Sequence, residues 1–229
     1  NVFLPYFTSN GANVGYVTMT FSSNPPTSGG GEIVNVGLAC NASLPLPAVA
    51  GKIALAARGT CSFGEKATNA INAGAVAVVI SNNAAGVFNG TLGAVIGDGS
   101  IPVVGISLAD GNFLRAQAAP VNLTWTNQQA SFPSPTGGLI SSFSSFGLSP
   151  DLALKPDIAA PGGNIYSTYP LESGGFATLG GTSMSSPHVA GAAALLLQSR
   201  KHLRATHVRT ILQNSADPHP WFGNPGLGF

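Results

Sequence analysis

The first half of the chain alternates short apolar strands with short helices, an order that restricts it to a mixed α/β fold. Lys52–Ala57 has the composition of a short buried strand, which Arg58–Thr60 interrupts. Ser62 is positioned as a helix N-cap, and apolar residues then recur at helical spacing until Gly74 ends the pattern. Ala75–Ile80 follows as a second buried strand. The pattern therefore predicts a strand–helix–strand unit.

A second unit of the same kind begins at Ile101–Ile106, another short apolar strand. Ser107 then opens a short helix, with Asp110 at the third position of a capping box. The spacing predicts that Phe113 and Leu114 point toward the core. No internal repeat is evident beyond these two units.

Composition excludes several classes of protein. Hydrophobic residues make up 44% of the 229 residues, which is enough for a core and argues against intrinsic disorder. The net charge of +1 comes without a Lys/Arg cluster, so we expect no nucleic-acid partner. The longest apolar run, Ala190–Leu197, is far shorter than the ~20 residues that span a bilayer. We expect a soluble protein without a membrane segment.

Two cysteines and three N-x-[ST] sequons favour an extracellular chain. Cys40 and Cys61 lie in loop-like sequence and are expected to form a disulfide worth roughly 3 kcal/mol. The sequons begin at Asn41, Asn89 and Asn122. Sequons also arise by chance, and two cysteines in a cytosolic protein would be free thiols. A secreted chain accounts for both the cysteine pair and the sequons.

A turn-rich connection, Gln128–Gly138, separates two differently patterned halves. Ser-rich strands and a long helix of small residues follow it. We place a domain boundary near Ser134, so that residues 1–133 form one domain and residues 134–229 another.

The first domain resembles the protease-associated (PA) domain. The resemblance rests on Cys40, the strand Gly51–Leu55, the loop Arg58–Phe63, the turn Ala73–Ala75 and the strand Ile101–Val104. It implies a small β-rich α/β insert that shapes substrate access or mediates partner contacts without chemistry of its own. The sequence of this domain is consistent with a module that has no chemistry of its own, because it pairs no two carboxylates and clusters no His with Cys. We expect no metal and no cofactor.

The second domain contains a serine at a glycine-bounded helix start, in the string Gly180–Gly191. A helix N-terminus offers free N–H groups and a favourable dipole for negative charge, and glycines let a substrate backbone approach. Such a site suits a serine nucleophile at Ser183, which also needs a base. By physics alone, Thr182-Ser183 before an apolar helix is more often an ordinary N-cap.

The string from Gly181 to Gly191, GTSMSSPHVAG, resembles the serine motif of the subtilisin-like proteases. Two upstream segments, Phe143–Gly147 and Lys155–Gly162, resemble the sequence that precedes it in that family. The resemblance implies the C-terminal portion of a parallel α/β peptidase domain. It makes Ser183 the attacking residue of a serine endopeptidase, with its own N–H in the oxyanion hole, and makes Asp157 a structural residue that orders a loop. The implied substrate-binding residues are Ser144, Ser145, Gly147, Gly181 and Thr182.

The activating acid and base are not evident in these residues. His188 lies five residues after Ser183 on one helix and therefore points away from its hydroxyl. The resemblance makes this histidine a packing residue with a buried, hydrogen-bonded role. His202, His207 and His219 lie beyond that helix. No D-[ST]-G acid motif in the right context and no H-G-T-x-V-A-G base motif occurs, and the oxyanion-hole asparagine of the family is also unmatched.

We therefore expect a piece of a longer protease, with a processed or cut start at Asn1 and an unfinished tail. Thr206 is expected to cap a last helix, with Val208, Ile211 and Leu212 facing inward. Apolar surface left open would favour a partner chain or self-association. Polypeptide is the expected substrate. Two rivals stay open: a non-catalytic fragment that binds protein or glycan, and a dimerising or glycosylated structural module.

Overall fold

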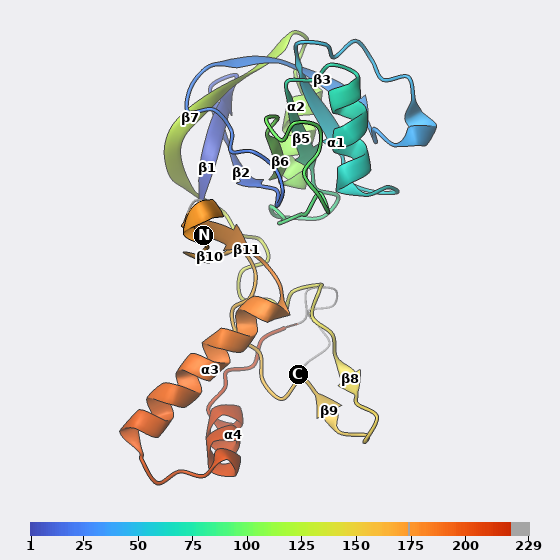
Figure 1. Ribbon diagram of the computed structural model, residues 1–229. Coiled ribbons are helices and arrows are strands. Elements are labelled where there is room, and N and C mark those ends of the chain that lie inside the picture. Colours follow the sequence, from blue (N-terminus) through green and yellow to red (C-terminus); the bar gives the residue numbers. More distant parts are fainter. Residues whose placement is uncertain (174, 221–229) are drawn as a thin grey trace. The chain divides into compact units, whose positions relative to one another are not determined.

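A computed structural model describes residues 1–173 and 175–220, and the chain divides into two compact units, residues 1–135 and 136–229 (Figure 1). The first unit combines a barrel with two helices, and the second combines two hairpins with two helices. The fold is mixed α/β, as the sequence predicts.

The strands of the first unit are β1 (Val2–Ser9), β2 (Ala12–Thr18), β3 (Gly30–Gly37), β4 (Ile53–Ala57), β5 (Ala77–Ser81), β6 (Val103–Ile106) and β7 (Val121–Phe132). They form a closed seven-stranded barrel in the order β1-β2-β6-β5-β4-β3-β7. Strands β3, β4, β5 and β6 pair in parallel, while β1, β2 and β7 pair antiparallel and close the barrel. The sequence patterns predicted β4, β5 and β6, but neither the parallel strand β3 nor the antiparallel strands.

Helix α1 (Phe63–Asn72) connects the parallel strands β4 and β5. Its N-cap is Ser62, whose hydroxyl oxygen accepts a hydrogen bond from the Glu65 N–H at 3.1 Å. Gly74 ends the turn with φ +87°, a left-handed conformation that favours glycine. The predicted strand–helix–strand unit is confirmed, with its boundaries shifted by one or two residues.

Helix α2 (Leu108–Ala116) follows β6 and repeats the same capping chemistry. The Ser107 oxygen accepts from the Asp110 N–H at 3.0 Å, and the Ser107 hydroxyl donates to Asp110 Oδ2 at 2.6 Å. Leu114 is buried and Phe113 packs against the same core, as predicted.

An aromatic cluster fills the barrel beside β4 and β5. Phe7, Tyr16 and Trp125 are all buried, and the Trp125 ring meets the other two edge-on at centroid distances of 5.5 and 5.6 Å. Burial raises the pKa of Tyr16 to about 12. These rings come from the antiparallel strands, so β1, β2 and β7 supply much of the core that holds the parallel strands.

The second unit contains two short hairpins and two helices. Strands β8 (Gly147–Leu148) and β9 (Leu154–Lys155) form one hairpin, and β10 (Ile165–Thr168) and β11 (Phe176–Leu179) form the other. Helices α3 (Thr182–Ser199) and α4 (Ala205–Asn214) follow. Two 3₁₀ turns occur among the described residues, η1 (Asn41–Ser43) and η2 (Leu171–Ser173).

Helix α3 is apolar, yet none of its residues is buried in the described part of the chain. Leu195 is 68% exposed and Leu197 is 42% exposed. No described helix has both the length and the apolar character that crossing a membrane would need.

The start of helix α4 differs from the sequence-based prediction. Its N-cap is Arg204 and carries no side-chain cap bond, so Thr206 lies inside the helix instead of capping it. Val208 is buried and Ile211 and Leu212 are half-buried, as predicted. The last residues of the expected tail, 221–229, lie outside the described part.

Candidate active site

Ser183 is the second residue of α3 and is exposed. The N-cap is Gly181, with φ +154° and no side-chain cap bond. Ser183 therefore does not act as the N-cap that physics alone allowed. Its hydroxyl also has no hydrogen-bond partner among residues 1–173 and 175–220, so it is open to a base and to a substrate.

Backbone donors accompany this hydroxyl. The Met184 N–H is satisfied by the Gly181 carbonyl oxygen at 3.0 Å. The N–H groups of Thr182 and Ser183 have no acceptor within the described part of the chain. Free N–H groups in the first turn of a helix are the donors that a developing oxyanion requires.

The turn that precedes Ser183 is held by Gly162, a residue whose role the sequence analysis missed. Its carbonyl oxygen accepts from the Gly181 N–H at 2.7 Å. A Cβ at position 162 would lie 2.1 Å from Ser185 Oγ and 2.8 Å from the Gly181 carbonyl oxygen. Only glycine fits without displacing the start of α3. Its place in the string Lys155–Gly162 was the available signal, but that string does not reveal which residue touches the turn.

None of the described histidines forms a hydrogen bond with the Ser183 hydroxyl. His188 Nδ1 lies 2.8 Å from the Met184 carbonyl oxygen of its own helix, and His219 Nδ1 lies 2.8 Å from the Gly138 carbonyl oxygen. The prediction that His188 is buried is wrong, because no described element covers that side of α3 and the residue is exposed. Its predicted hydrogen bond is present.

The remaining predicted substrate residues lie before the serine motif. The Ser144 N–H donates to the Ser141 carbonyl oxygen at 2.9 Å, Ser145 is exposed, and Gly147 begins β8. Among described residues, no hydrogen bond joins Ser144 or Ser145 to Ser183. Their substrate-binding role stays a prediction.

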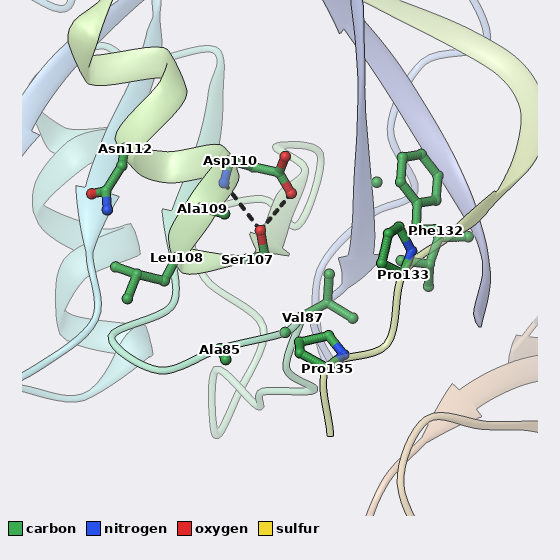
Figure 2. A pocket seen from close by; sticks show the side chains of 13 residues that line it. Ala85, Val87, Ser107, Leu108, Ala109, Asp110, Asn112, Phe132, Pro133 and Pro135 are labelled. Carbon is green, nitrogen blue, oxygen red and sulfur yellow. Dashed lines mark hydrogen bonds between the residues drawn. The ribbon is translucent and has the colours of Figure 1, made fainter. Parts of the chain in front are cut away.

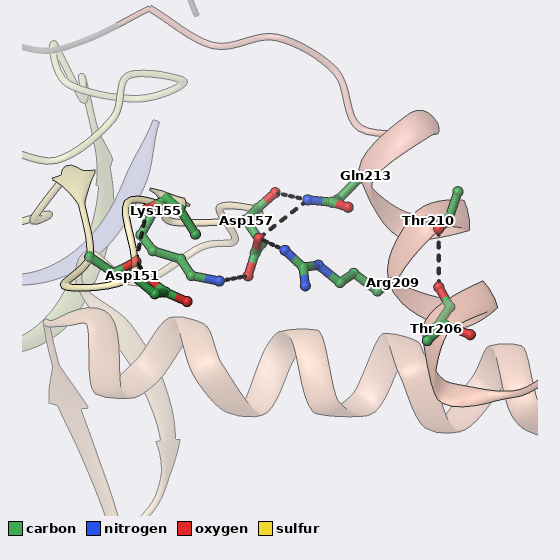
Figure 3. A network of polar contacts seen from close by, with 9 residues as sticks. Asp151, Lys155, Asp157, Thr206, Arg209, Thr210 and Gln213 are labelled. Carbon is green, nitrogen blue, oxygen red and sulfur yellow. Dashed lines mark hydrogen bonds and ion pairs between the residues drawn. The ribbon is translucent and has the colours of Figure 1, made fainter.

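Asp157 connects the segment after β9 to α4 (Figure 3). Its Oδ2 pairs with Lys155 Nζ at 2.7 Å, and its Oδ1 forms an ion pair with Arg209. The Gln213 amide donates to the Asp157 carbonyl oxygen at 3.2 Å. The hydrogen bond from Lys155 and the pairing with Arg209 lower the pKa of this carboxyl. The carboxylate is thus engaged in holding a loop on a helix, which is the role that the resemblance implied.

The predicted disulfide between Cys40 and Cys61 is present. Glu65 contributes a carboxylate oxygen that lies with the two sulfur atoms inside a span of 4.8 Å. Such a trio has the composition of a metal site only when the cysteines are thiolates. In the disulfide the sulfurs are poor ligands, and the Lys66 ammonium also lies against them.

The three sequon asparagines lie on the first unit. Asn122 is exposed on β7, and Asn89 is half-buried. Asn41 is exposed in η1, and its Oδ1 accepts from the Asn69 amide at 3.0 Å. The Asn41 amide nitrogen, which is the atom that carries a glycan, takes no part in that bond.

A mostly apolar cavity of about 530 Å³ opens on the first unit between β1, β2, the start of α2 and the segment 132–135 (Figure 2). Its polar groups include the Ser107–Asp110 pair at the start of α2. Burial raises the pKa of the Asp110 carboxyl, and the hydrogen bond from Ser107 opposes that shift. The cavity has the size and lining of a small binding site, and its residues include no His, Cys or Lys that could act as nucleophile or base.

An exposed serine on an unsatisfied helix start, in a mixed α/β chain, is an arrangement typical of acyl-transfer sites. The family model of Peptidase S8, the subtilase family, matches residues 37–227. The chain therefore belongs to the subtilase family.

The chain is 34% identical over 190 residues to the minor extracellular protease Vpr of Bacillus subtilis, a match that covers 81% of this chain and 23% of that protein. It is 41% identical over 148 residues to the C5a peptidase of Streptococcus pyogenes, covering 65% of this chain and 12% of that protein. It thus spans less than a quarter of either relative. The solved structure of the subtilisin-like protease Apa1 from Pseudoalteromonas sp. AS-11 aligns with 94% of this chain and 43% of its own, at 20% identity and a TM-score of 0.45.

Proposed function

We propose that the chain carries the nucleophile of a serine endopeptidase, Ser183, and that the acid and base come from polypeptide outside these 229 residues. The observation that carries the proposal is the open start of α3, where an exposed hydroxyl lies next to N–H groups without acceptors. Membership of the subtilase family and the protease names of both relatives support it.

In the proposed reaction, Ser183 Oγ attacks the carbonyl carbon of a substrate peptide bond while the supplied base removes the hydroxyl proton. The negative charge that forms on the carbonyl oxygen is met by the Ser183 N–H and the dipole of α3. The base returns the proton to the leaving amine, which breaks the C–N bond and leaves an acyl-enzyme. Water then hydrolyses the ester and restores the hydroxyl.

The glycines have a positioning role in this scheme. Gly162 fixes the carbonyl and N–H groups of the turn, and Gly181 adopts a φ of +154°, which other residues rarely accept. Neither residue touches the reacting atoms. Both determine where the Ser183 hydroxyl lies relative to the substrate carbonyl, and a small displacement there is costly.

The first unit is proposed to be a PA-type module that acts in substrate access or partner contacts. We also propose that the chain is secreted and glycosylated at one or more of Asn41, Asn89 and Asn122. The disulfide and the extracellular relative Vpr support secretion. Treatment with a glycan-removing enzyme, followed by intact mass, tests the glycans on protein from its natural source.

A fluorophosphonate probe tests the nucleophile in a preparation that contains both this chain and the polypeptide with the acid and base motifs. We expect covalent labelling of Ser183, and loss of both labelling and peptide hydrolysis in Ser183→Ala. Ser186→Ala is the matched control, because Ser186 is also exposed near the start of α3. Labelling that persists in Ser183→Ala, or no labelling in the complete preparation, contradicts the proposal.

The second candidate is a non-catalytic binding module, and the cavity on the first unit is the observation that favours it. It predicts that peptides bind to the first unit whether or not Ser183 is present. Fluorescence binding titrations with Ser183→Ala and with Leu108→Trp, which narrows the cavity, separate the two. Loss of binding in the cavity variant alone supports the module, and an unlabelled, inactive complete preparation would then favour it over the enzyme.

A further inference from the structure

A fully buried lysine lies against the disulfide. Lys66 is 0% exposed, and its Nζ lies 2.7 Å from the Leu38 carbonyl oxygen, 3.3 Å from Cys61 Sγ and 3.5 Å from Cys40 Sγ. An ammonium group has three N–H donors and no acceptor, and these three neighbours can accept one bond each. The geometry therefore suits the charged form of the lysine, although burial lowers its pKa.

Glu65 is the other charged group beside the sulfurs. Its carboxylate oxygen lies within 4.8 Å of both, and it accepts a hydrogen bond from the Asn41 N–H at 2.9 Å. It is half-exposed, so solvent screens its charge more than that of the buried Lys66. The Lys66 Nζ lies 3.3 Å from Cys61 Sγ and 3.5 Å from Cys40 Sγ. Its positive charge therefore dominates the electrostatic environment of the pair.

This environment favours the reduced state. The sulfur atoms of a disulfide are weak, uncharged acceptors, whereas a thiolate forms a charge-assisted hydrogen bond. A cation next to a cysteine stabilises the thiolate, and stabilising the reduced form makes a disulfide more oxidising. Reduction also gives the buried Lys66 ammonium a second counter-charge in direct contact, in addition to the Glu65 carboxylate nearby.

The two sulfurs differ in access. Cys40 is 4% exposed, while Cys61 is half-exposed. A thiolate from solvent reaches Cys61 first, and the sulfur that leaves is then Cys40, which lies beside Lys66. A leaving thiolate with a lowered pKa leaves faster.

We propose that Cys40–Cys61 is a thiol-exchange site, poised by the buried Lys66, and not an inert structural crosslink. A thiolate of an external dithiol attacks Cys61 Sγ, a new S–S bond forms to Cys61, and the Cys61–Cys40 bond breaks. Cys40 leaves as a thiolate paired with Lys66. The second thiol of the reductant then attacks the mixed disulfide, which frees Cys61 and leaves the reductant oxidised.

Redox titration of the 229-residue chain tests the proposal. The chain is equilibrated with mixtures of reduced and oxidised dithiothreitol, and the reduced fraction is read by alkylation and mass spectrometry. We expect Lys66→Met to require about a tenfold more reducing mixture than the wild type, or about 30 mV for this two-electron couple. Glu65→Gln is the matched variant at the neighbouring residue. Removing the negative charge of Glu65 is expected to shift the reduction potential of the disulfide by a smaller amount in the opposite direction.

A trapping experiment does not depend on either variant. Glutathione is added to the wild type, the freed thiol is alkylated at once, and peptides are mapped. We expect glutathione on Cys61 and the alkyl group on Cys40. If Lys66→Met fails to fold, as judged by its thermal melt, the redox titration of Glu65→Gln and the trapping experiment on the wild type test the proposal. An unchanged or more easily reduced disulfide in folded Lys66→Met, a harder reduction in Glu65→Gln, or glutathione on Cys40 overturns the proposal.

Discussion

Replacing Gly162 by alanine tests whether the start of α3 must be held where it is. The added Cβ would lie 2.1 Å from Ser185 Oγ, which is about 1.3 Å short of the 3.4 Å at which ordinary contact begins. The Ser185 hydroxyl can rotate away, but the Gly181 carbonyl oxygen at 2.8 Å is backbone and cannot. The turn before Ser183 must therefore move. A displacement of about 1 Å at a catalytic group costs on the order of 100-fold in rate.

The assay is the rate of fluorophosphonate labelling of Ser183 in the complete preparation. Gly163→Ala is the control, because its Cβ would lie 3.6 Å from Ser141 Oγ, an ordinary contact. We expect Gly162→Ala to label on the order of 100-fold more slowly and Gly163→Ala to label at nearly the wild-type rate. Equal rates for the two alanine variants, with both folded, would refute the positioning role of Gly162.

Three further predictions concern stability. Replacing Cys40 and Cys61 by serine should lower the free energy of unfolding of the first unit by roughly 3 kcal/mol, measured by chemical denaturation. Ser62→Ala removes the N-cap of α1 and should cost about 1 kcal/mol in the same measurement. Because the pKa of Asp157 is lowered in the fold, its contribution is present above the unfolded value of about 3.9 and is lost as pH falls through the folded pKa. Hydrogen exchange should show acid loosening of α4 in the wild type and not in Asp157→Asn, and an identical acid response would contradict the role of the ion pair with Arg209.

The parts of the fold that the sequence predicts are those that local chemistry determines. Ser62 and Ser107 begin helices because each oxygen reaches the N–H three residues later, a bond that depends on neighbouring residues alone. The apolar runs of β4 and β5 are recognisable for a similar reason, since both faces of those strands are buried. The disulfide was predicted from cell compartment, not from local geometry.

The parts that escaped prediction depend on segments far apart in the chain. Lys66 is buried because the loop that contains Leu38 and Cys40 covers α1, and no sequence window shows that contact. Gly162 contacts a turn about twenty residues further along the chain. His188 was expected to be buried because the resemblance to the serine motif makes it a packing residue, but a residue on an apolar helix is buried only where another element covers it.

The exposure of α3 links stability to the proposed chemistry. A helix that is apolar on most sides is stable in water only when other polypeptide covers it, and each Å² of apolar surface left open costs about 25 cal/mol. Leu195 and Leu197 lie near the end of the helix that begins next to Ser183, so polypeptide that covered its whole length would also approach the helix start. If that polypeptide carries the base, burial of α3 and activation of Ser183 are one event. Protection of α3 from hydrogen exchange and fluorophosphonate labelling of Ser183 should then increase together as the partner polypeptide is titrated in. Labelling without protection of α3 would show that the two are separate events.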